Sequence, residues 1–484
     1  METILDYIDL QARVTPDHTF LADRERALTF REFSSLVKKM SYLLHKEKIT
    51  KGERVLLYVN NRINHIISYF ATMSIGAIAV HVYPEKKWEY VRFAVELTGA
   101  SMVVTDKSPE SENIASPVYP FPSFEENSQE YSSKERSEVA YMMFTSGTTG
   151  RPKAVMTTHA NILYTARTVI KIAGMKPGDR EIIFLPLGST GGLGHLHCSL
   201  MLGNFAFLYH KFFLAIDQRE ITQILNLIES HRVTGFLATP HVLIQLLESH
   251  RERFQLLGKN LNYILANVHP MKEDVIKEII SLLRGVRFAM YYGLTEASRS
   301  AYNIYSETGK YSKTGQAASG VSLKIAHQDS ETGIGEVLIK GPNVAQGYWG
   351  KGSFVDEEGW FSSGDAGSLD KDGFLTIHGR VDELISVGGM KSTPAEIEAV
   401  LKSFPGITES AVVGVEDENT YQKICAAIVL EEGVDPKTLR KELNTFLDEK
   451  LEFYKKPVEI TILQDLPKTE LGKVQRKKVK EYFK

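Results

Sequence analysis

The segment of residues 145–154 has the composition of a phosphate-binding loop. Its sequence, TSGTTGRPKA, places four hydroxyl side chains, two glycines and Lys153 between two apolar runs. Glycines let backbone N–H groups approach anionic oxygens, hydroxyls donate further hydrogen bonds, and a lysine supplies positive charge. The loop is not a Walker A motif, because Pro152 stands where that motif requires its second glycine. An isolated run of this kind is more often a surface turn, so its interpretation depends on the rest of the chain.

Four further motifs follow this loop. They are YGLTE at residues 292–296, SGD at 363–365, GRVD at 379–382 and PKTELGK at 467–473. In this order, the five motifs resemble those of the adenylate-forming superfamily, which contains acyl- and aryl-CoA synthetases, adenylation domains of peptide synthetases, and luciferases. The resemblance begins at the TFREF segment of residues 29–33 and extends almost to the C-terminus, so it covers nearly the whole chain.

The resemblance implies that the chain activates a carboxylic acid. The carboxylate would attack the α-phosphate of ATP to give an acyl-adenylate and pyrophosphate, and a thiol would then displace AMP. Several negative charges approach one another in this reaction, so cations and hydrogen-bond donors carry the catalysis. The implied cofactors are ATP, Mg²⁺ and coenzyme A.

The resemblance also assigns the nucleotide contacts. The β- and γ-phosphates would be held by Thr145, Ser146, Gly147, Thr148, Thr149, Gly150 and Lys153. The adenine would lie beside Val268, His269, Pro270, Tyr292 and Gly293, and the ribose would contact Asp365 and Arg380. A carboxylate can accept two hydrogen bonds at once, which suits the two ribose hydroxyls. The chain departs from the usual family pattern at Ala154, where glycine is common, and at Ser362, where arginine is common.

Three residues would act on the reacting groups. Glu296 matches the acid that coordinates Mg²⁺, a hard cation that prefers oxygen ligands, and Thr295 would face the α-phosphate. Lys473 matches the lysine that bridges the α-phosphate and the substrate carboxylate. The alternative for Lys473 is one more solvated lysine in a basic tail, but its spacing in the PKTELGK motif favours the catalytic role.

The second half-reaction implies a movement of the C-terminal part. Asp382 matches the position at which the family hinges, and a rotation there would let the thiol reach the adenylate. Gly388 and Gly389 would line the passage for the pantetheine arm, because missing side chains permit close approach. The lysine at this point of the chain, Lys391, makes the segment more similar to acyl- and aryl-CoA ligases than to the adenylation domains of peptide synthetases.

The identity of the acid is the least determined part of the prediction. The candidate wall residues are small or neutral, which suits an aryl or short-to-medium acyl group, and they are Ser189, Thr190, Gly191, Gly192, Ala238, Tyr291 and Ala297. Residues 185–201 contain no acid that could pair with an α-ammonium group, so an α-amino acid is disfavoured. Arg299 could pair with a polar substituent of the substrate, or it could be a surface residue. His195 and His197 are two residues apart and do not share a helix face, so we expect packing roles rather than a metal site.

Alternating strand and helix patterns must position these residues. Strands are predicted at residues 54–58, 77–82, 102–105, 233–238 and 286–291, and helices at 62–73, 219–231, 242–247 and 272–283. This alternation predicts an α/β fold whose large N-terminal domain has mainly parallel sheets flanked by helices. The pattern becomes β-rich from Val337, and a small mobile α+β domain follows. The predicted domains are residues 1–381, which bind ATP and the acid, and 382–484, which carry Lys473.

Composition limits the class of protein. The chain has 484 residues, is 43% hydrophobic and has a formal net charge of −3, so nothing favours nucleic acid as a partner. Its two cysteines cannot form a disulfide framework, its N-terminus lacks a basic signal region, and no apolar stretch is long enough for a membrane span, so we expect a cytoplasmic protein.

Three functions remain open at this stage. The first is an AMP-forming acid–CoA ligase. The second is a stand-alone adenylation enzyme that loads the acid onto the phosphopantetheine of an acyl carrier protein. The third is a catalytically inactive adenylate-binding protein, which the retained Lys153, Glu296, Asp365 and Lys473 disfavour.

Overall fold

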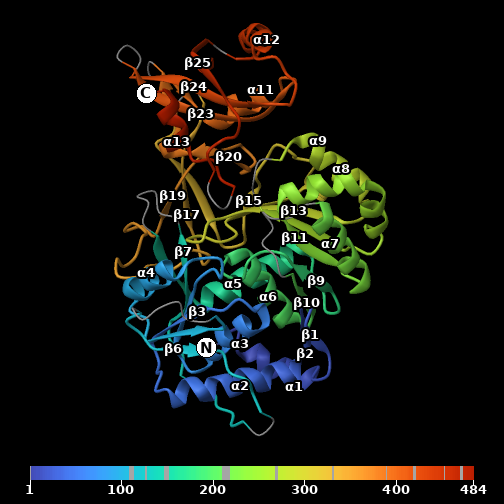
Figure 1. Cartoon of the computed structure of the whole chain (residues 1–484), viewed down its shortest axis with the longest axis vertical. Coiled ribbons are helices and arrows are strands. Elements are labelled where there is room, and N and C mark those ends of the chain that lie inside the picture. Colours follow the sequence, from blue (N-terminus) through green and yellow to red (C-terminus); the bar gives the residue numbers. More distant parts are fainter. Residues whose placement is uncertain are drawn as a thin grey trace. The chain divides into compact units, whose positions relative to one another are not determined.

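The computed structural model describes most of the chain. The described residues are 2–107, 114–125, 128–133, 135–145, 152–209, 218–267, 271–329, 332–387, 390–417, 421–451, 453–468 and 472–483. They form two compact units, shown in Figure 1. The first unit contains Met1–Leu323 and Ile339–Phe361, and the second contains Lys324–Leu338 and Ser362–Lys484.

The first unit is built on two large sheets. The nine-stranded sheet has the order β15-β14-β13-β12-β11-β9-β10-β1-β2, and its six central strands, from β13 to β1, run parallel. Its strands are β1 (Thr19–Ala22), β2 (Ala27–Thr29), β9 (Arg180–Ile183), β10 (Phe205–Leu208), β11 (Gly235–Ala238), β12 (Tyr263–Asn267), β13 (Arg287–Tyr292), β14 (Ala301–Ile304) and β15 (Gln316–Ala317).

The seven-stranded sheet has the order β18-β8-β7-β4-β3-β5-β6. Its strands β7, β4, β3, β5 and β6 run parallel, and β8 and β18 are antiparallel to their neighbours. The strands are β3 (Arg54–Tyr58), β4 (Ile78–His81), β5 (Met102–Thr105), β6 (Val118–Pro120), β7 (Val139–Thr145), β8 (Lys153–Thr158) and β18 (Gly347–Tyr348).

Helices cover both faces of both sheets. The largest core joins α2, α3, α5 and α6 to strands of the two sheets, as in the cluster that contains Phe33, Phe70, Leu196, Val55 and Ala206. These helices therefore form a layer between the sheets (Figure 1). The helices α7, α8 and α9 cover the outer face of the nine-stranded sheet, and α4 packs on the seven-stranded sheet.

The helices of the first unit begin and end where the sequence supplies caps. Thr29 and Glu32 form a capping box at α2, and Thr158 forms one with Asn161 at α5. The helices are α1 (Asp6–Val14), α2 (Phe30–Lys46), α3 (Arg62–Ser74), α4 (Trp88–Thr98), α5 (His159–Ala173), α6 (Thr190–Leu202), α7 (Gln218–Ser230), α8 (Pro240–Leu257), α9 (Glu273–Leu282) and α10 (Tyr305–Thr308).

The second unit contains most of a four-stranded sheet and a five-stranded sheet with three helices. The first sheet has the order β16 (Ser322–Ala326), β17 (Gly335–Lys340), β19 (Phe361–Leu369) and β20 (Leu375–Arg380). The second contains β21 (Ile385–Val387), β22 (Met390–Ser392), β23 (Ile407–Asp417), β24 (Tyr421–Leu430) and β25 (Glu459–Leu463). The helices are α11 (Pro394–Lys402), α12 (Pro436–Lys450) and α13 (Arg476–Lys480), and short 3-10 turns occupy Val381–Glu383, Phe453–Lys455 and Glu481–Phe483.

This architecture confirms the predicted fold class. The strands predicted at 54–58 and 102–105 coincide with β3 and β5, and the helix predicted at 62–73 and the strand predicted at 77–82 correspond to α3 and β4. No helix in the described ranges has the length and apolar character that crossing a membrane requires. The second compact unit includes β19 and β20, which precede Asp382. The predicted domain division at Asp382 stays a prediction, because it concerns where the C-terminal part moves rather than which residues pack together.

Candidate active site

The predicted phosphate-binding loop connects two paired strands. Thr145 is the last residue of β7, Lys153 is the first residue of β8, and the two residues are direct partners in the antiparallel ladder. This pairing holds the two ends of the loop together at one end of the seven-stranded sheet. Five predicted phosphate contacts, Ser146, Gly147, Thr148, Thr149 and Gly150, lie outside the described residues.

Glu296 is held in position beside this hairpin. Its carboxylate accepts hydrogen bonds from the Thr145 hydroxyl at 3.2 Å and from the Tyr348 hydroxyl at 3.0 Å, and the residue is only 8% exposed. The Lys153 ammonium lies 4.7 Å from the centre of the Tyr348 ring. The structure therefore brings together the predicted Mg²⁺ ligand and two predicted phosphate contacts.

Tyr348 connects these residues and was missed by the sequence reasoning. It belongs to β18, which pairs with β8 so that Tyr348 lies opposite Val155. It is 52 positions away from Glu296 in the sequence. No local pattern indicates such a contact, because strand pairing over a long sequence separation creates it.

The YGLTE motif follows the end of β13. Tyr292 is the last residue of that strand and is buried, and Gly293 begins the turn that carries Thr295 and Glu296. A Cβ atom at Gly293 would lie 2.5 Å from the Arg299 backbone nitrogen, so only glycine fits there. The turn is closed by hydrogen bonds in both directions between the backbones of Leu294 and Ala297, at 3.0 and 3.2 Å.

The carboxyl ends of three parallel strands bring the predicted residues Ala238 and Tyr292 to one edge of the nine-stranded sheet. Ala238, Asn267 and Tyr292 end β11, β12 and β13, which are neighbours in the sheet. Ligands of open α/β sheets bind at this edge. Val268, His269 and Pro270, which follow β12, lie outside the described residues.

Close packing surrounds two glycines at the start of α6, and at Gly192 the neighbouring atoms belong to the backbone. Ser189 caps the helix by accepting a hydrogen bond from the Gly192 N–H at 3.2 Å. A Cβ atom at Gly192 would lie 2.4 Å from the Pro186 carbonyl oxygen, and one at Gly191 would lie 2.6 Å from Leu185 Cδ1. The helix therefore approaches the preceding segment closely. Of the predicted acid-pocket residues, Thr190 alone lines the cavity described next, while Ala238, Tyr291 and Ala297 are buried.

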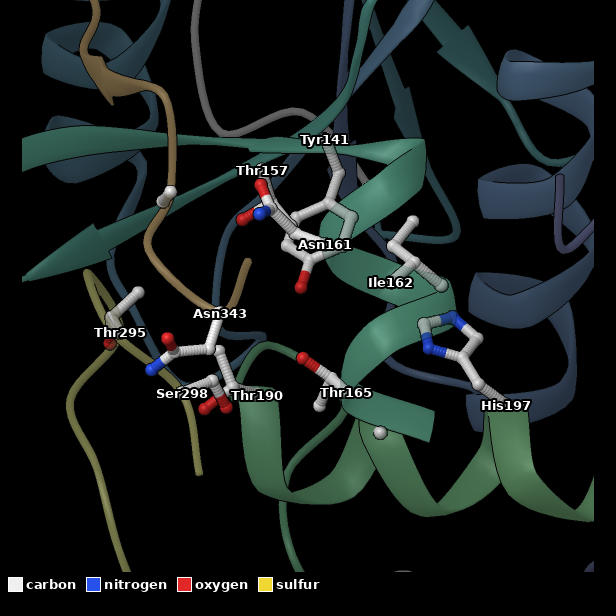
Figure 2. A pocket seen from close by; sticks show the side chains of 12 residues that line it. Tyr141, Thr157, Asn161, Ile162, Thr165, Thr190, His197, Thr295, Ser298 and Asn343 are labelled. Atoms are coloured by element: carbon white, nitrogen blue, oxygen red, sulfur yellow. The ribbon is translucent and has the colours of Figure 1, made fainter. Parts of the chain in front are cut away.

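A small cavity of about 10 Å³, with room for one water molecule, lies between α5, α6 and the turn after β13 (Figure 2). Two of its buried oxygens, Thr157 Oγ1 and Asn343 Oδ1, have no hydrogen-bond partner among the described residues. Figure 2 shows Thr295, Ser298, Thr190 and Asn343 on one side of the cavity and His197 on the other. Its lining residues are Tyr141, Thr157, Asn161, Ile162, Thr165, Thr190, Gly194, His197, Thr295, Ser298, Asn343 and Ala345.

Arg299 lies behind the wall of this cavity. It is 1% exposed, so the surface alternative for this residue is wrong. Its Nη1 donates to the Ser298 hydroxyl at 2.6 Å, and its guanidinium lies 4.7 Å from the centre of the Tyr291 ring. Its Nε and Nη2 have no hydrogen-bond acceptor among the described residues.

The buried histidines form hydrogen bonds within the protein. His65 Nε2 lies 2.9 Å from His81 Nδ1, and His197 Nε2 lies 3.1 Å from the Tyr69 hydroxyl. Burial lowers the pKa of His65 to about 4 and that of His197 to about 3, so both rings are neutral near pH 7. His195 bonds to Glu181, and both side chains are 1% exposed.

Magnesium would have to be held largely by the substrate. Among the described residues, no group of three or more histidine, cysteine, aspartate or glutamate side chains could hold a metal ion. Mg²⁺ in nucleotide sites is commonly bound by one or two carboxylates together with phosphate oxygens and water. The oriented carboxylate of Glu296 beside Lys153 fits that arrangement.

The second unit carries the remaining predicted residues. Asp365 and Arg380 are ladder partners in β19 and β20, and their side chains form an ion pair at 2.9 Å. Arg380 also donates to the Ser363 carbonyl oxygen at 2.9 Å, and its Nε lies 3.6 Å from a carboxylate oxygen of Asp382. Gly364 has φ +68° and a Cβ there would lie 2.4 Å from Arg380 Nη2, so the arginine requires a glycine at this point.

Lys473 and the predicted hinge are at the surface of this unit. Lys473 is exposed and precedes Val474, which bridges to Lys468. The side chain of Asp382 is 60% exposed and belongs to the Val381–Glu383 turn. Lys391 lies in β22, while Gly388 and Gly389 lie outside the described residues.

Two family models and several known enzymes are similar to this chain over most of its length. A family model described as AMP-binding enzyme matches residues 8–349, and a model described as AMP-binding enzyme C-terminal domain matches residues 396–473. The 2-succinylbenzoate–CoA ligase of Bacillus pumilus (strain SAFR-032) is 30% identical over 97% of this chain and 96% of that protein. The ligase of the same name from Bacillus subtilis (strain 168) is 28% identical over 97% and 96% of the two chains.

Solved structures show the same architecture. The o-succinylbenzoate CoA synthetase MenE from Bacillus subtilis, in complex with the acyl-adenylate intermediate OSB-AMP, matches with a TM-score of 0.86 at 27% identity over 98% of this chain and 97% of that one. The same enzyme with ATP and magnesium ion matches with a TM-score of 0.84 at 28% identity, over 98% and 99% of the two chains. ATP-bound MatB from Rhodopseudomonas palustris has a TM-score of 0.84 at 24% identity over 98% and 99%, which shows the shared fold.

Proposed function

The chain belongs to the AMP-binding enzyme family and is an AMP-forming acid–CoA ligase, and we propose that its acid is an aromatic keto acid of the 2-succinylbenzoate class. ATP, Mg²⁺ and coenzyme A are its cofactors. One observation carries the assignment of the reaction centre: the Glu296 carboxylate is fixed between the Thr145 and Tyr348 hydroxyls beside Lys153. The relatives of nearly equal length that are named 2-succinylbenzoate–CoA ligases support the proposed acid.

The residues of the first unit bind and orient the phosphates in this proposal. Lys153 and the Thr145 hydroxyl would contact the β- and γ-phosphates, and Glu296 would hold the metal ion. Bound Mg²⁺ would neutralise charge that develops on the phosphate oxygens. Thr295 donates to the α-phosphate, which keeps the phosphorus in line with the attacking carboxylate. Tyr348 keeps Glu296 from turning away, because its hydroxyl occupies one carboxylate oxygen.

The residues of the second unit bind the ribose and complete the charge stabilisation. Asp365 accepts both ribose hydroxyls, and Arg380 would exchange part of its ion pair with Asp365 for contacts to the nucleotide. Lys473 bridges the α-phosphate and the substrate carboxylate during adenylate formation. Rotation at Asp382 then withdraws Lys473 and opens the thiol passage.

Coenzyme A is the thiol acceptor in this proposal. The relatives are named as CoA ligases, and no specific contact among the described residues favours an acyl carrier protein. The inactive adenylate-binding alternative does not hold, because the chain is an enzyme of this family.

The test is pyrophosphate release with ATP and Mg²⁺ across a panel of carboxylic acids, each measured with and without coenzyme A. We expect 2-succinylbenzoate to be activated and the rate to rise when coenzyme A is added, with the CoA thioester identified by mass spectrometry. Acid-dependent release that coenzyme A leaves unchanged, with no thioester formed, would argue for a carrier-protein acceptor. Activation of an unrelated acid alone would overturn the proposed substrate.

A further inference from the structure

The segment that carries Lys473 is closed at its base by backbone pairing. Lys468 and Val474 form an antiparallel bridge, and the Gln475 N–H donates to the Pro467 carbonyl oxygen at 2.7 Å. Lys473 itself is exposed and comes directly before the bridge. The direction in which the lysine points therefore depends on what holds this base in place.

Arg476 holds one end of the base through two carboxylates. Its Nε lies 3.2 Å from Glu383 Oε2, and its Nη2 lies 2.9 Å from Glu398 Oε1. The three side chains are between 14% and 27% exposed, so solvent and salt screen these ion pairs less than they screen a surface pair. At the other end of the base, Lys468 Nζ lies 2.7 Å from Glu409 Oε1.

The two carboxylates that Arg476 contacts come from different elements. Glu398 lies in α11, and its Oε1 also accepts a hydrogen bond from a backbone N–H of β23 at 2.8 Å. Glu383 ends the short turn that contains Asp382. Arg476 therefore joins the start of α13, three positions after Lys473, to the residue that follows the predicted hinge.

The ion pairs on the two sides of the predicted hinge differ in strength. Before it, Arg380 Nε lies 3.6 Å from Asp382, whose side chain is 60% exposed, and such a pair contributes little. After it, the pair of Glu383 with Arg476 is shorter and more buried. Rotation at the hinge would therefore break the first contact and keep the second, and the segment of Lys473 would turn together with Glu383.

Apolar packing holds α13 on β23 independently of these ion pairs. Val479 of α13 is fully buried in an apolar cluster that contains Val413 of β23, Leu466 and Phe483. Burial of apolar side chains is the dominant favourable term in folding. We therefore expect the helix to stay in place when Arg476 is replaced by an apolar residue of similar length.

We propose that Arg476 is a positioning residue for Lys473, because its ion pairs fasten the base of the lysine's segment to the residue that follows the hinge. This inference rests on the proposed function, in which Lys473 acts in adenylate formation and Asp382 is the hinge. The charge of Arg476 is already balanced by Glu383 and Glu398, so Arg476 acts through Lys473 rather than by binding a phosphate.

The experiment is a double-mutant cycle of Arg476→Met and Lys473→Ala in which the two half-reactions are measured separately. The acid is 2-succinylbenzoate or, if the enzyme prefers another acid of the panel, that acid. In Arg476→Met we expect kcat for adenylate formation to fall about 30-fold and the KM values to stay within about threefold, because the lysine is present but displaced. Thioester formation from the prepared acyl-adenylate and coenzyme A should stay within about threefold of the wild-type rate.

The double variant isolates the action of Arg476 through Lys473. It should form the adenylate no more slowly than Lys473→Ala alone, within about threefold, because no lysine is left to position. A residue that merely stabilises the unit would instead lower the rate by the same factor in both backgrounds.

Three further variants define the contact. Arg476→Lys keeps the charge but not the fork that reaches two carboxylates, and should lose only about fivefold. Glu383→Gln removes the charge at the hinge turn and leaves the pair with Glu398, and it should lose about tenfold even if Arg476→Met does not fold. Arg440→Met is the matched control, because Arg440 lies in α12 of the same unit and donates to the Ile460 carbonyl oxygen at 3.3 Å. It should leave both half-reactions at the wild-type rate.

The outcomes separate the inference from the proposed function. Equal losses of both half-reactions in Arg476→Met and Glu383→Gln, or a double variant much slower than Lys473→Ala, overturn the role of Arg476. Wild-type rates in Arg476→Met together with a loss in Lys473→Ala overturn the inference alone and leave the proposed function standing. If Lys473→Ala forms the adenylate at the wild-type rate, the proposed role of Lys473 is wrong and the inference falls with it.

Discussion

At the scale of single residues, the carboxylate of Glu296, which we propose as the magnesium ligand, is held in one orientation by its neighbours. Two hydroxyls, from Thr145 and Tyr348, donate to its carboxylate. A carboxylate with two hydrogen bonds loses little further freedom when it coordinates a cation, so the arrangement is preorganised. The Tyr348 ring also lies under the Lys153 ammonium, which keeps a cation close to the same carboxylate.

This arrangement predicts the effects of two substitutions. Glu296→Gln removes the charge that would hold Mg²⁺ and should lower kcat/KM for adenylate formation by about 100-fold or more. Tyr348→Phe removes one hydrogen bond but keeps the ring under Lys153, so we expect a loss of only about fivefold. Pyrophosphate release measured over a range of Mg²⁺ concentrations checks both values. Equal losses in the two variants would contradict the assigned roles.

At the scale of elements, two neighbouring glycines at the start of α6 differ in what surrounds them. A Cβ atom added at Gly192 would lie 2.4 Å from a backbone carbonyl oxygen that cannot move independently, whereas Gly191 faces the end of the flexible Leu185 side chain. Gly192→Ala should therefore lower the free energy of unfolding by about 2 kcal/mol, the usual cost of overpacking. Gly191→Ala is the matched control and should cost about 1 kcal/mol or less, since alanine also favours the helix. Urea unfolding of the two variants checks the difference, and a reversed order would contradict the packing explanation.

The buried histidines of α3 and α6 predict how stability depends on pH. Burial is the main cause that lowers the pKa of His65 to about 4 and of His197 to about 3, against about 6.5 in the unfolded chain. Below pH 6.5 the unfolded state therefore binds more protons than the folded state. Each histidine should then remove about 1.4 kcal/mol of stability per pH unit as the pH falls from 6.5 toward 4.

Unfolding free energies measured between pH 7 and pH 5 check this prediction. The variant His197→Gln keeps a hydrogen-bonding group near Tyr69 but does not titrate. The slope of its unfolding free energy against pH should therefore be smaller than the wild-type slope by about 1.4 kcal/mol per pH unit. A variant slope equal to the wild-type slope would show that His197 is already protonated in the folded protein or that other groups dominate.

Much of the fold can be predicted from the sequence, because local periodicity reports local structure. The alternation of apolar and polar residues predicted β3, β5, α7 and α9 within a few residues of their observed bounds. The pairing of β1 with β10, where Leu21 lies opposite Ala206, could not be predicted, since nothing local to either strand encodes a partner far away in the sequence. The same reason explains why the contact of Tyr348 and the burial of Arg299 were not predicted. The motif residues Thr145, Lys153 and Glu296 do lie close together, and their roles in the reaction stay predictions.

At the scale of the whole molecule, the candidate residues are divided between two compact units. Glu296, Thr295 and Lys153 belong to the first unit, and Asp365 and Lys473 belong to the second. We propose that the two half-reactions use different placements of the part that follows Asp382. Lys473 would then be required in the first half-reaction and be absent from the second.

This division predicts a selective defect in Lys473→Ala. Adenylate formation from the acid and ATP should fall about 1000-fold, the upper range for loss of one charge-stabilising donor. Thioester formation from a chemically prepared acyl-adenylate and coenzyme A should stay within about threefold of the wild-type rate, because Lys473 takes no part in that step of the proposed mechanism. The control is Lys477→Ala, a change in the same basic segment that should leave both steps intact. Equal loss of both half-reactions would contradict the proposed movement.

The two cysteines have a consequence for an enzyme that handles a free thiol. Cys198 and Cys425 are the only cysteines of the chain, both are fully buried, and burial raises the pKa of Cys198 well above its usual value and that of Cys425 to about 11. Attack on a disulfide requires an accessible thiolate, and neither residue offers one. Oxidised coenzyme A therefore finds no sulfur on this protein with which to form a mixed disulfide, and activity should survive exposure to a stoichiometric excess of it. The enzyme can work beside its thiol substrate without being covalently trapped by that substrate's oxidation product.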